Sequence, residues 1–334
     1  MIRIAVDAMG GDRGPGQIVA GALAARDAGL TPLLVGPAAL DTHGLELLEA
    51  PDVIAMHEKP AEAVRAKPQS SLVAAVRAVG EGRADAVVSA GNTGAMLAAG
   101  LLELRRIPGV LRPAIAVPIP ARRGPSLLID AGANADARPE HLVQFATMGA
   151  VFAEEILDVA NPEVRLLSIG EEREKGNQLT LEAHELLAAG DLNFAGNCEG
   201  RDLLGGAADV VVTDGFTGNV ALKTAEGVAK MIGHFLKSAL MRSVLGRVGA
   251  FLSRGALRTL RKKFDTRALN GGMFLGLNGV VVKSHGGTDA EGFAYAVEWG
   301  YEMVHYDLLK KIIQMLNRDG GAFASVPTAQ EAVS

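Results

Sequence analysis

Two glycine-rich turns, each following a short apolar run, carry residue types that bind anions. The run 86–89 leads into Ala90 to Gly94, and the run 210–212 leads into Thr213 to Asn219. Each pattern predicts a strand, a turn and a helix start, where glycine lets the backbone approach a ligand and free amides suit an anion. Such turns also serve only to reverse a chain, but a matched pair favours phosphate binding. The predicted phosphate-binding residues are Gly91, Asn92, Thr93, Gly94, Gly215, Thr217 and Gly218.

A lysine and a histidine end a third apolar run, 279–282. Because side chains alternate along a strand, Lys283 and His285 are expected on the same side of it. A single histidine at a strand end is often structural, but here lysine, glycine and a predicted phosphate turn accompany it. Together with two polar residues of the second turn, they give a predicted catalytic group of Lys283, His285, Asn219 and Asp214.

Carboxylates and amides at other predicted strand ends supply further candidates. The opening strand, 2–6, runs into Asp7 and Asp12 with two glycines between them, and open α/β sheets place ligands at the carboxyl ends of strands. These acids suit a substrate or Mg²⁺, or Asp12 caps a helix while Asp7 stabilises the turn. The further site candidates are Asp7, Gly10, Gly11, Asp12, Asn134, Asn197 and Glu199.

Alternating strands and helices are predicted to position these residues. Strands are expected at 2–6, 31–36, 53–57, 86–89, 127–130, 164–169, the start of 193–202, 210–212 and 279–282. Helices are expected at about 15–28, 70–80, from the Gly91 turn to about 105, 139–157 and 180–189. Residues 58–68 are expected to form a surface loop, and the proline-rich stretch 113–120 only an irregular or edge strand.

This order predicts an α/β protein with three layers, α/β/α, and a mostly parallel sheet. We find no linker between residues 2 and 316. A single catalytic domain, 1–316, is therefore expected, followed by a poorly ordered tail, 317–334.

Composition limits the classes of function. Hydrophobic residues make up 49% of the 334 residues and aromatics only 4%, which suits buried aliphatic strands. The net charge of -5 argues against general nucleic-acid binding. A single cysteine, Cys198, excludes an internal disulfide and a cysteine-based zinc cluster. With no signal peptide and no long apolar run, the chain is expected in the cytoplasm.

One segment, 230–267, departs from this acidic balance. Apolar residues recur there at three- and four-residue spacings, and basic residues occur without any acidic residue between 230 and 263. Such a segment can lie on an anionic membrane, bind an acidic protein, or form a hairpin buried against a second copy. Gly246, Gly249 and Gly255 are expected to divide it into helices. The predicted docking residues are Arg242, Arg247, Phe251, Arg254, Arg258 and Arg261.

Taken together, the turns resemble those of the bacterial phosphate acyltransferase (PlsX) family. The resemblance covers nearly all of 2–316 and rests on residues 7–12, 89–95, 169–172, 196–200, 214–219 and 283–286. It implies transfer of a fatty acyl group from acyl carrier protein to inorganic phosphate, giving acyl phosphate for phospholipid synthesis. It also implies a fold like that of isocitrate and isopropylmalate dehydrogenases and phosphotransacetylases.

The same resemblance implies a homodimer that associates peripherally with the membrane and with a downstream membrane acyltransferase. No cofactor or metal is expected. Met273-Phe274-Leu275 departs from the family's usual Ala-Pro-Leu-Leu, which is expected to change the fit of the acyl chain. The position of Cys198 is not one that the family reserves for cysteine, which argues against a thiol nucleophile.

In the implied reaction, a phosphate oxygen attacks a thioester carbon and a thiolate leaves. The site must offset the repulsion between two anionic partners, align them, and donate hydrogen bonds to the developing oxyanion. Lys283 is the candidate for charge neutralisation and His285 for donation to the oxyanion or sulfur. Asp214 would orient one of these groups rather than act as a base. All of them are expected to meet at one edge of the sheet.

Three other functions compete with this interpretation. A metal-dependent decarboxylating dehydrogenase would need grouped carboxylates and a nucleotide site, and the sequence shows no such group. A coenzyme A-dependent phosphotransacetylase differs in its donor, and the sequence does not distinguish a phosphopantetheine arm on coenzyme A from one on a carrier protein. A lipid-surface scaffold would leave the paired glycine turns unexplained.

Overall fold

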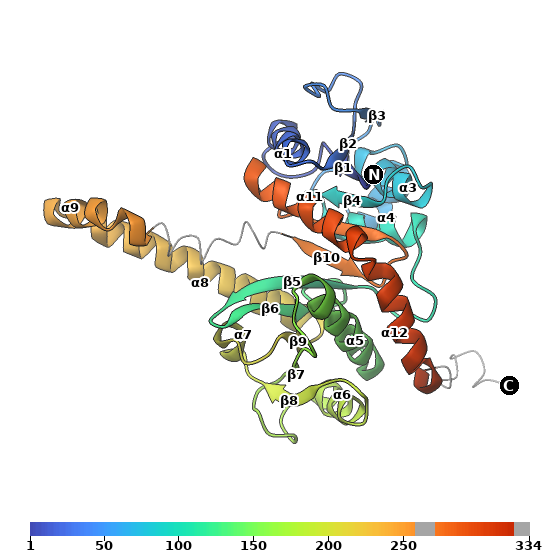
Figure 1. Cartoon of the computed structure of the whole chain (residues 1–334), viewed down its shortest axis with the longest axis vertical. Helices are drawn as coiled ribbons and strands as arrows, with labels where there is room; N and C mark the ends of the chain where they lie inside the picture. Colours follow the sequence, from blue (N-terminus) through green and yellow to red (C-terminus); the bar gives the residue numbers. More distant parts are fainter. Residues whose placement is uncertain (258–270, 324–334) are drawn as a thin grey trace.

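A single mixed sheet runs through the computed structural model, which describes residues 1–257 and 271–323 (Figure 1). The strands lie in the order β3-β2-β1-β4-β11-β10-β5-β6-β9-β7-β8. Their bounds are β1 (Arg3–Asp7), β2 (Thr31–Gly36), β3 (Leu47–Glu49), β4 (Ala86–Ser89), β5 (Ala114–Ala121), β6 (Gly124–Ile129), β7 (Val164–Leu167), β8 (Phe194–Cys198), β9 (Val210–Val212), β10 (Gly272–Leu275) and β11 (Val280–Lys283).

The sheet is mostly parallel, as predicted, but it changes direction in its middle. Seven of the ten strand pairs are parallel. The three antiparallel pairs are consecutive in the sheet: β11 with β10, β10 with β5, and β5 with β6. Three successive reversals make β6, β9, β7 and β8 run opposite to β1, β4 and β11. The carboxyl ends of these two sets of strands therefore lie at opposite sides of the sheet. Below, an edge of the sheet means one of these two rows of strand ends.

Helices cover both faces, which confirms the three-layer α/β/α prediction. One face packs against α1 (Pro15–Asp27), α5 (Pro139–Ile156), α6 (Gln178–Ala188), α11 (Ala290–His305) and α12 (Leu308–Phe323). The other packs against α2 (Pro60–Ala66), α3 (Ser71–Gly80), α4 (Thr93–Glu103), α7 (Asp202–Gly205) and the start of α8 (Gly215–Met241). Strands covered on both faces need apolar residues throughout, which is why β4, β9 and β11 are continuously buried.

The region between β2 and α3 differs from the prediction. Residues 53–57 do not form a strand, and the third strand is Leu47–Glu49 instead. The expected loop 58–68 contains α2, which starts with Pro60 at its first position. Proline is favourable there because its fixed φ suits a helix start and its missing amide needs no partner. The sequence reading treated this proline only as a loop residue.

The prediction of an edge or irregular strand at 113–120 was wrong, because β5 lies inside the sheet between β10 and β6. The paired residues explain how an interior strand tolerates proline. β10 pairs only with Ala114 to Ala116, whereas Pro118 and Pro120 lie beyond that contact and face β6 alone. The prolines therefore occupy a part of β5 that is an edge in practice.

Helices α8 and α9 (Val244–Leu252) form an arm that leaves the body of the molecule, with α9 at its outer end (Figure 1). The break between them lies at Arg242 and Ser243, not within α9 at Gly246 or Gly249 as predicted. Ser243 caps α9 by accepting a hydrogen bond from the amide of Gly246. A side chain at Gly246 would lie 2.5 Å from the carbonyl oxygen of Leu240, so this glycine permits the tight turn.

Two further boundaries depart from expectation. α8 starts at Gly215, so residues 215–219 belong to a helix rather than to a turn before one. α12 continues to Phe323, which makes 317–323 helical instead of part of a poorly ordered tail. The rest of that tail, 324–334, lies outside the described residues. Within 1–257 and 271–323, no helix has both the length and the apolar character needed to span a bilayer.

Candidate functional site

Three polar side chains form a row across neighbouring strands at one edge of the sheet. Asp7 of β1 is in register with Ser89 of β4, and Ser89 is in register with Lys283 of β11. Alternation along each strand places all three on the face covered by α3 and α4, which is the face of Ala5, Val87 and Val281. The row lies at the carboxyl ends of three parallel strands, where open α/β sheets bind ligands.

Asp7 is the anchor of a buried hydrogen-bond network. Its carboxylate accepts from the hydroxyls of Ser71 and Ser89, each at 2.6 Å, and from the amide of Met9 at 3.3 Å. The Ser89 hydroxyl oxygen accepts in turn from the amide of Gly91 at 2.9 Å. Burial raises the pKa of Asp7, and these hydrogen bonds act in the opposite direction. The network ties β1, α3 and the turn after β4 together.

Lys283 brings a buried cation to this row. Its side chain is part of a residue only 9% exposed, and its ammonium donates to the carbonyl oxygen of Ser284. Burial lowers the pKa of Lys283 to about 8, while Asp12 and Asp7 oppose that shift. The ammonium is thus charged at neutral pH in a poorly solvated place, where an incoming anion interacts with it more strongly than in water.

Glycines let the three strand ends approach one another closely. A side chain at Gly10 would lie 2.6 Å from the Gly91 amide nitrogen, and one at Gly11 would lie 3.0 Å from the Gly286 carbonyl oxygen. Gly11 also has a φ of 96°, which favours glycine. The amide of Asp12 donates to the carbonyl oxygen of Gly286 at 2.7 Å. The structure thereby brings Asp7, Gly10, Gly11, Asp12, Gly91 and Lys283 together.

His285 and α8 border the same edge. The Nδ1 atom of His285 accepts from the Gly287 amide at 3.0 Å, so the neutral ring carries its proton on Nε2. Partial burial lowers the pKa of His285, and the charge of Lys223 on α8 lowers it further. The Lys223 charge also lowers the pKa of Lys283. Two lysines and a histidine therefore converge on this edge of the sheet.

Asn92, a predicted phosphate ligand, makes structural hydrogen bonds with all of its side-chain polar atoms. Its side-chain amide donates to the carbonyl oxygens of Met56 and Glu58, at 2.9 and 3.1 Å. Its side-chain oxygen accepts from the Ala95 amide at 3.0 Å and caps α4. These contacts hold the loop before α2 against the start of α4. The backbone of Thr93 and Gly94 forms the first turn of α4, beside the row.

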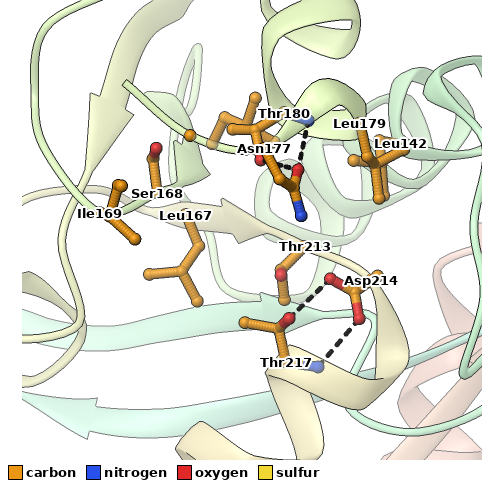
Figure 2. Close-up of a pocket in the computed structure, with 12 residues that line it drawn as sticks. Leu142, Leu167, Ser168, Ile169, Asn177, Leu179, Thr180, Thr213, Asp214 and Thr217 are labelled. Atoms are coloured by element: carbon orange, nitrogen blue, oxygen red, sulfur yellow. Dashed lines mark hydrogen bonds between the residues drawn. The ribbon is translucent and has the colours of Figure 1, made fainter.

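A second group of predicted residues surrounds the start of α8, and Figure 2 shows Asp214 there facing Thr217. Both carboxylate oxygens of Asp214 accept from Thr217, from its amide at 2.9 Å and its hydroxyl at 2.7 Å. Asp214 is thus the cap of α8. The amide of Gly215 donates to the carbonyl oxygen of Asn134 at 2.8 Å. Amides that we expected to bind phosphate are therefore used within the protein.

Buried Asp130 organises the loop on which α8 starts. Its carboxylate accepts from the amides of Ile115, Gly132, Ala133 and Asn134 at 2.7 to 3.1 Å, and from the side-chain amide of Asn134 at 2.8 Å. The side-chain amide of Asn134 also donates to the Pro113 carbonyl oxygen. Asn134, a predicted site residue, is therefore a structural residue of this loop.

The two glycine turns do not meet, which corrects the expectation of a common edge. The Gly91 turn follows β4 and the Gly215 turn follows β9, and these strands run in opposite directions. α8 links the two edges, because it starts at Asp214 and brings Lys223 within electrostatic range of Lys283. Exposed Asn219 lies one turn before Lys223, beside Gly132. Of the predicted catalytic group, only Lys283 and His285 are brought together directly.

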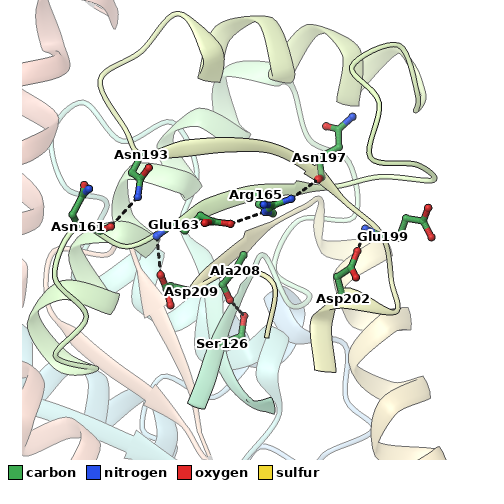
Figure 3. Close-up of polar contacts among 10 residues, drawn as sticks. All are labelled: Ser126, Asn161, Glu163, Arg165, Asn193, Asn197, Glu199, Asp202, Ala208 and Asp209. Carbon is green, nitrogen blue, oxygen red and sulfur yellow. Dashed lines mark hydrogen bonds and ion pairs between the residues drawn. The ribbon is translucent and has the colours of Figure 1, made fainter. Parts of the chain in front are cut away.

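Asn197 and Glu199 lie outside both groups, in polar contacts around β7, β8 and β9 (Figure 3). The side chain of Asn197 donates to the Glu172 carbonyl oxygen and its oxygen lies 3.1 Å from Nδ1 of His184. Glu199 forms an ion pair with Arg201 at 3.4 Å. Burial raises the pKa of nearby Cys198 to about 12, which agrees with the prediction that this thiol is not a nucleophile.

A pocket of about 300 Å³ opens beside the start of α8 (Figure 2). Its apolar lining comes from five aliphatic side chains on α5, β7, the loop after β7 and α6: Leu142, Leu166, Leu167, Ile169 and Leu179. Its polar lining is neutral apart from Asp214, whose two oxygens are held by Thr217. The lining contains no lysine or arginine.

The sequence reading missed three residues that the structure places at these edges: Ser71, Asp130 and Lys223. Their partners lie far away in the chain, so no local pattern marks them. Among the docking residues, Arg242, Arg247, Phe251 and Arg254 are exposed on the arm. Arg258 and Arg261 lie outside the described residues. Within the described chain, no group of three or more histidine, cysteine and acidic side chains is arranged to hold a metal.

Comparison with known proteins agrees with this architecture. Residues 2–311 match the family model described as "Fatty acid synthesis protein". The chain is 48% identical over 349 residues to a phosphate acyltransferase of Afipia carboxidovorans, covering 100% of this chain and 99% of that protein. It is likewise 48% identical over 351 residues, with the same coverage, to a phosphate acyltransferase of Rhodopseudomonas palustris strain HaA2.

Solved structures of lower identity share the fold. A branched-chain phosphotransacylase from Enterococcus faecalis V583 superposes with a TM-score of 0.62 at 17% identity, covering 91% of this chain and 99% of that one. A phosphotransacetylase from Streptococcus pyogenes gives a TM-score of 0.58 at 17% identity, covering 95% and 93%. These similarities confirm the predicted phosphotransacetylase-like fold.

Proposed function

The chain belongs to the phosphate acyltransferase (PlsX) family, and from that premise we propose that it transfers a fatty acyl group from acyl carrier protein to inorganic phosphate. The family membership also confirms the resemblance inferred from the turns. The observation that carries the proposal is the row Asp7, Ser89 and Lys283, which sets a buried cation at the carboxyl edge of the sheet. The product would be acyl phosphate, for use in phospholipid synthesis.

Charge neutralisation is the first task of the proposed site. Phosphate carries one to two negative charges near neutral pH. It would meet Lys283 and Lys223, whose charges influence each other, although Lys223 is also ion-paired with Glu226 at 3.0 Å. Asp7 partly balances Lys283 before phosphate arrives, because the two charges shift each other's pKa toward the ionised forms. Phosphate binding would then relieve the mutual repulsion of the two lysines, which favours an anion over a neutral ligand.

Acyl transfer itself needs alignment and oxyanion donors more than proton transfer. A phosphate oxygen bonds to the thioester carbon, the carbonyl oxygen gains negative charge, and the C–S bond then breaks to release the carrier thiolate. The Nε2 proton of His285 and the amides in the first turn of α4 border the row and are the proposed donors. Asp214 takes no part in this scheme, since its oxygens cap α8.

The direct experiment is incubation with palmitoyl-acyl carrier protein and phosphate, with acyl phosphate and free carrier thiol as readouts. Lys283→Ala is expected to lower turnover by about 10²-fold or more, as loss of an oxyanion-stabilising group does. Palmitoyl-coenzyme A serves as the alternative donor, because it presents the same phosphopantetheine arm without the carrier protein. Equal rates with both donors would argue against a dedicated carrier-protein enzyme, and no acyl phosphate with either would reject the proposal.

We further propose that the α8–α9 arm docks the enzyme on the cytoplasmic face of the membrane. Leu245, Phe251 and Leu252 are strongly exposed apolar side chains at its outer end. Arg242 and Arg247 are exposed beside them, and Arg254 lies 4.9 Å from the ring centre of Phe251. Exposed apolar residues bordered by cations suit an anionic lipid surface. Phe251→Asp should release the protein from anionic vesicles without changing its rate on soluble donor.

We also propose that the α8–α9 arm binds proteins, and three partners can be tested: acyl carrier protein, a second copy of the chain, and a downstream membrane acyltransferase. Acyl carrier protein is acidic, so Arg242→Glu with Arg247→Glu should raise the KM for the carrier if it docks there. A homodimer would bury the apolar face of α8, and light scattering on the wild type and on Ile232→Asp tests that arrangement. Association with a downstream membrane acyltransferase would be visible as co-sedimentation that Phe251→Asp does not abolish.

A further inference from the structure

The pocket beside the start of α8 suits a neutral, apolar guest rather than phosphate. Five aliphatic side chains line it, and its lining carries no cation. The amides of Gly215 and Thr217, which point to this helix start, are bonded to Asn134 and Asp214. An anion would lose its hydration here with no cation to replace it, and it would lie beside the Asp214 carboxylate with only neutral donors such as Asn177 and Thr213. A hydrocarbon would bury its surface against the leucines.

The mouth of the pocket is also partly apolar. Ile169 is 80% exposed there and, in Figure 2, lies on the opposite side of the pocket from Leu142 and Leu179. A hydrocarbon that entered the pocket beside Ile169 would bury part of this exposed side chain. The polar lining includes the buried residues Thr213 and Thr180 and the amide of Asn177, and the Thr180 hydroxyl donates to the side-chain oxygen of Asn177 at 2.8 Å.

Helix α8 leads from this pocket toward the lysine edge. Thr217 lines the pocket, and Lys223, which is ion-paired with Glu226 at 3.0 Å, lies within electrostatic range of Lys283. Val220 lies midway between Thr217 and Lys223 on the i, i+3, i+6 row of the helix surface. Val220 is 50% exposed, and Phe216, beside this row, is 67% exposed. From Thr217 to Lys223 the helix rises about 9 Å. An extended hydrocarbon advances about 1.2 Å per bond, so about seven or eight bonds cover that distance.

We propose that this pocket receives the distal end of a long fatty acyl chain whose thioester lies at the Lys283 edge, an inference that rests on the proposed acyltransferase function. The chain would leave the thioester at Lys283, follow Val220 and enter between Leu179 and Ile169. An octanoyl chain would end near the mouth of the pocket, because its whole length is needed to reach from Lys283 along α8 to that point. A hexadecanoyl chain places its last carbons inside. The pocket thus selects for chain length without touching the reacting atoms.

The test compares octanoyl- and hexadecanoyl-acyl carrier protein as donors, with phosphate as acceptor. Leu179→Phe fills the pocket, and Ile169→Trp narrows its mouth at an exposed position that folding tolerates. Each is expected to lower the ratio of kcat/KM for hexadecanoyl over octanoyl donor by about tenfold or more, since several methylenes lose their burial. Leu186→Phe, on the same helix but outside the pocket, is the matched control and should leave the ratio unchanged.

Two outcomes would overturn the pocket assignment while sparing the acyltransferase proposal. One is an unchanged ratio in both pocket variants. The other is an equal loss with both donors, which would place the phosphopantetheine arm in the pocket instead. If the wild type formed no acyl phosphate at all, the function proposal would fail separately. Calorimetric binding of hexadecanoate would then still test the pocket, with about tenfold weaker binding expected in Leu179→Phe and none of that loss in Leu186→Phe.

Discussion

Asp7 and Lys283 occupy one row of the sheet, on the two strands that flank β4, with the hydroxyl of Ser89 between them. Both side chains are buried. Burial raises the pKa of Asp7 and lowers that of Lys283, and the interaction between the two groups opposes both shifts. Neither charge would be stable there alone, because burial acts against both. Asp12 and Asp7 together oppose the effect of burial on Lys283, which keeps a poorly solvated ammonium available for phosphate.

Removing the Ser89 hydroxyl should destabilise the fold more than removing the Ser71 hydroxyl. Ser89→Ala takes a donor from Asp7 and also leaves the buried amide of Gly91 without its acceptor, which costs about 1–3 kcal/mol of unfolding free energy. Ser71→Ala takes only a donor from the same carboxylate. Urea denaturation of the two variants measures the difference. Equal losses would mean that the Gly91 amide finds another partner.

Turnover should fall as the pH rises through about 8. Lys283 is protonated below its pKa of about 8 and neutral above it, so its attraction for phosphate is present at low pH and lost at high pH. We expect kcat/KM for phosphate to approach a tenfold decrease per pH unit above that value. Lys283→Arg keeps the charge at every accessible pH, so it should remove this alkaline limb even if its rate is lower. A profile flat from pH 7 to 9.5 in the wild type would contradict the assignment.

Local patterns in the sequence were sufficient to predict the buried strands that precede two of the candidate groups. Val210 to Val212 and Val280 to Val282 read as buried strands because parallel strands covered on both faces are apolar throughout. Lys283 stood out because a charged residue directly follows such a run. The family resemblance then placed these strands in one α/β fold. The comparisons confirmed that placement.

Strand direction was beyond the reach of the sequence. β10 is a four-residue strand inserted antiparallel between β11 and β5, so β5 runs parallel to β11, and the antiparallel pairing of β5 with β6 then sends β6 and β9 the other way. The two similar turns, Gly-Asn-Thr-Gly at Gly91 and Gly-Phe-Thr-Gly at Gly215, consequently lie at opposite edges of the sheet. Long-range pairing decides this outcome, and a turn motif carries no information about it.

Long-range contacts also decided the roles of single residues. Gly215 and Gly218 looked like places where a ligand approaches the backbone, but the approaching group is the Asp130–Asn134 loop. Asn92 looked like a ligand donor, but Met56 and Glu58 take its two N–H groups. In each case the residue type correctly indicated that another group approaches the backbone closely or accepts a hydrogen bond from the side chain. The partner was a distant part of the same chain.

Asp214 should behave as a helix cap and not as a base. Asp214→Ala removes the acceptor for the Thr217 amide and should lower the unfolding free energy by about 1 kcal/mol. Asp214→Ser keeps an oxygen that can cap the helix and should restore most of that loss. Thermal denaturation of the two variants makes the comparison. If Asp214→Ser instead folded normally but lost turnover by orders of magnitude with an octanoyl donor, Asp214 would belong to the chemistry.

Gly218→Ala should be among the most damaging single substitutions in α8, because a side chain there would lie 2.0 Å from the carbonyl oxygen of Asp130. That oxygen belongs to backbone held by five donors to the Asp130 carboxylate, so it cannot move cheaply, and we expect a loss of about 3 kcal/mol or more of unfolding free energy. Gly227→Ala is the matched control, because Gly227 lies in the same helix with open space around its Cα. That substitution should stabilise the protein by about 0.5–1 kcal/mol through helix propensity alone. Urea denaturation gives both values, and a gain at Gly218 would show that α8 can start without contact to the Asp130 loop.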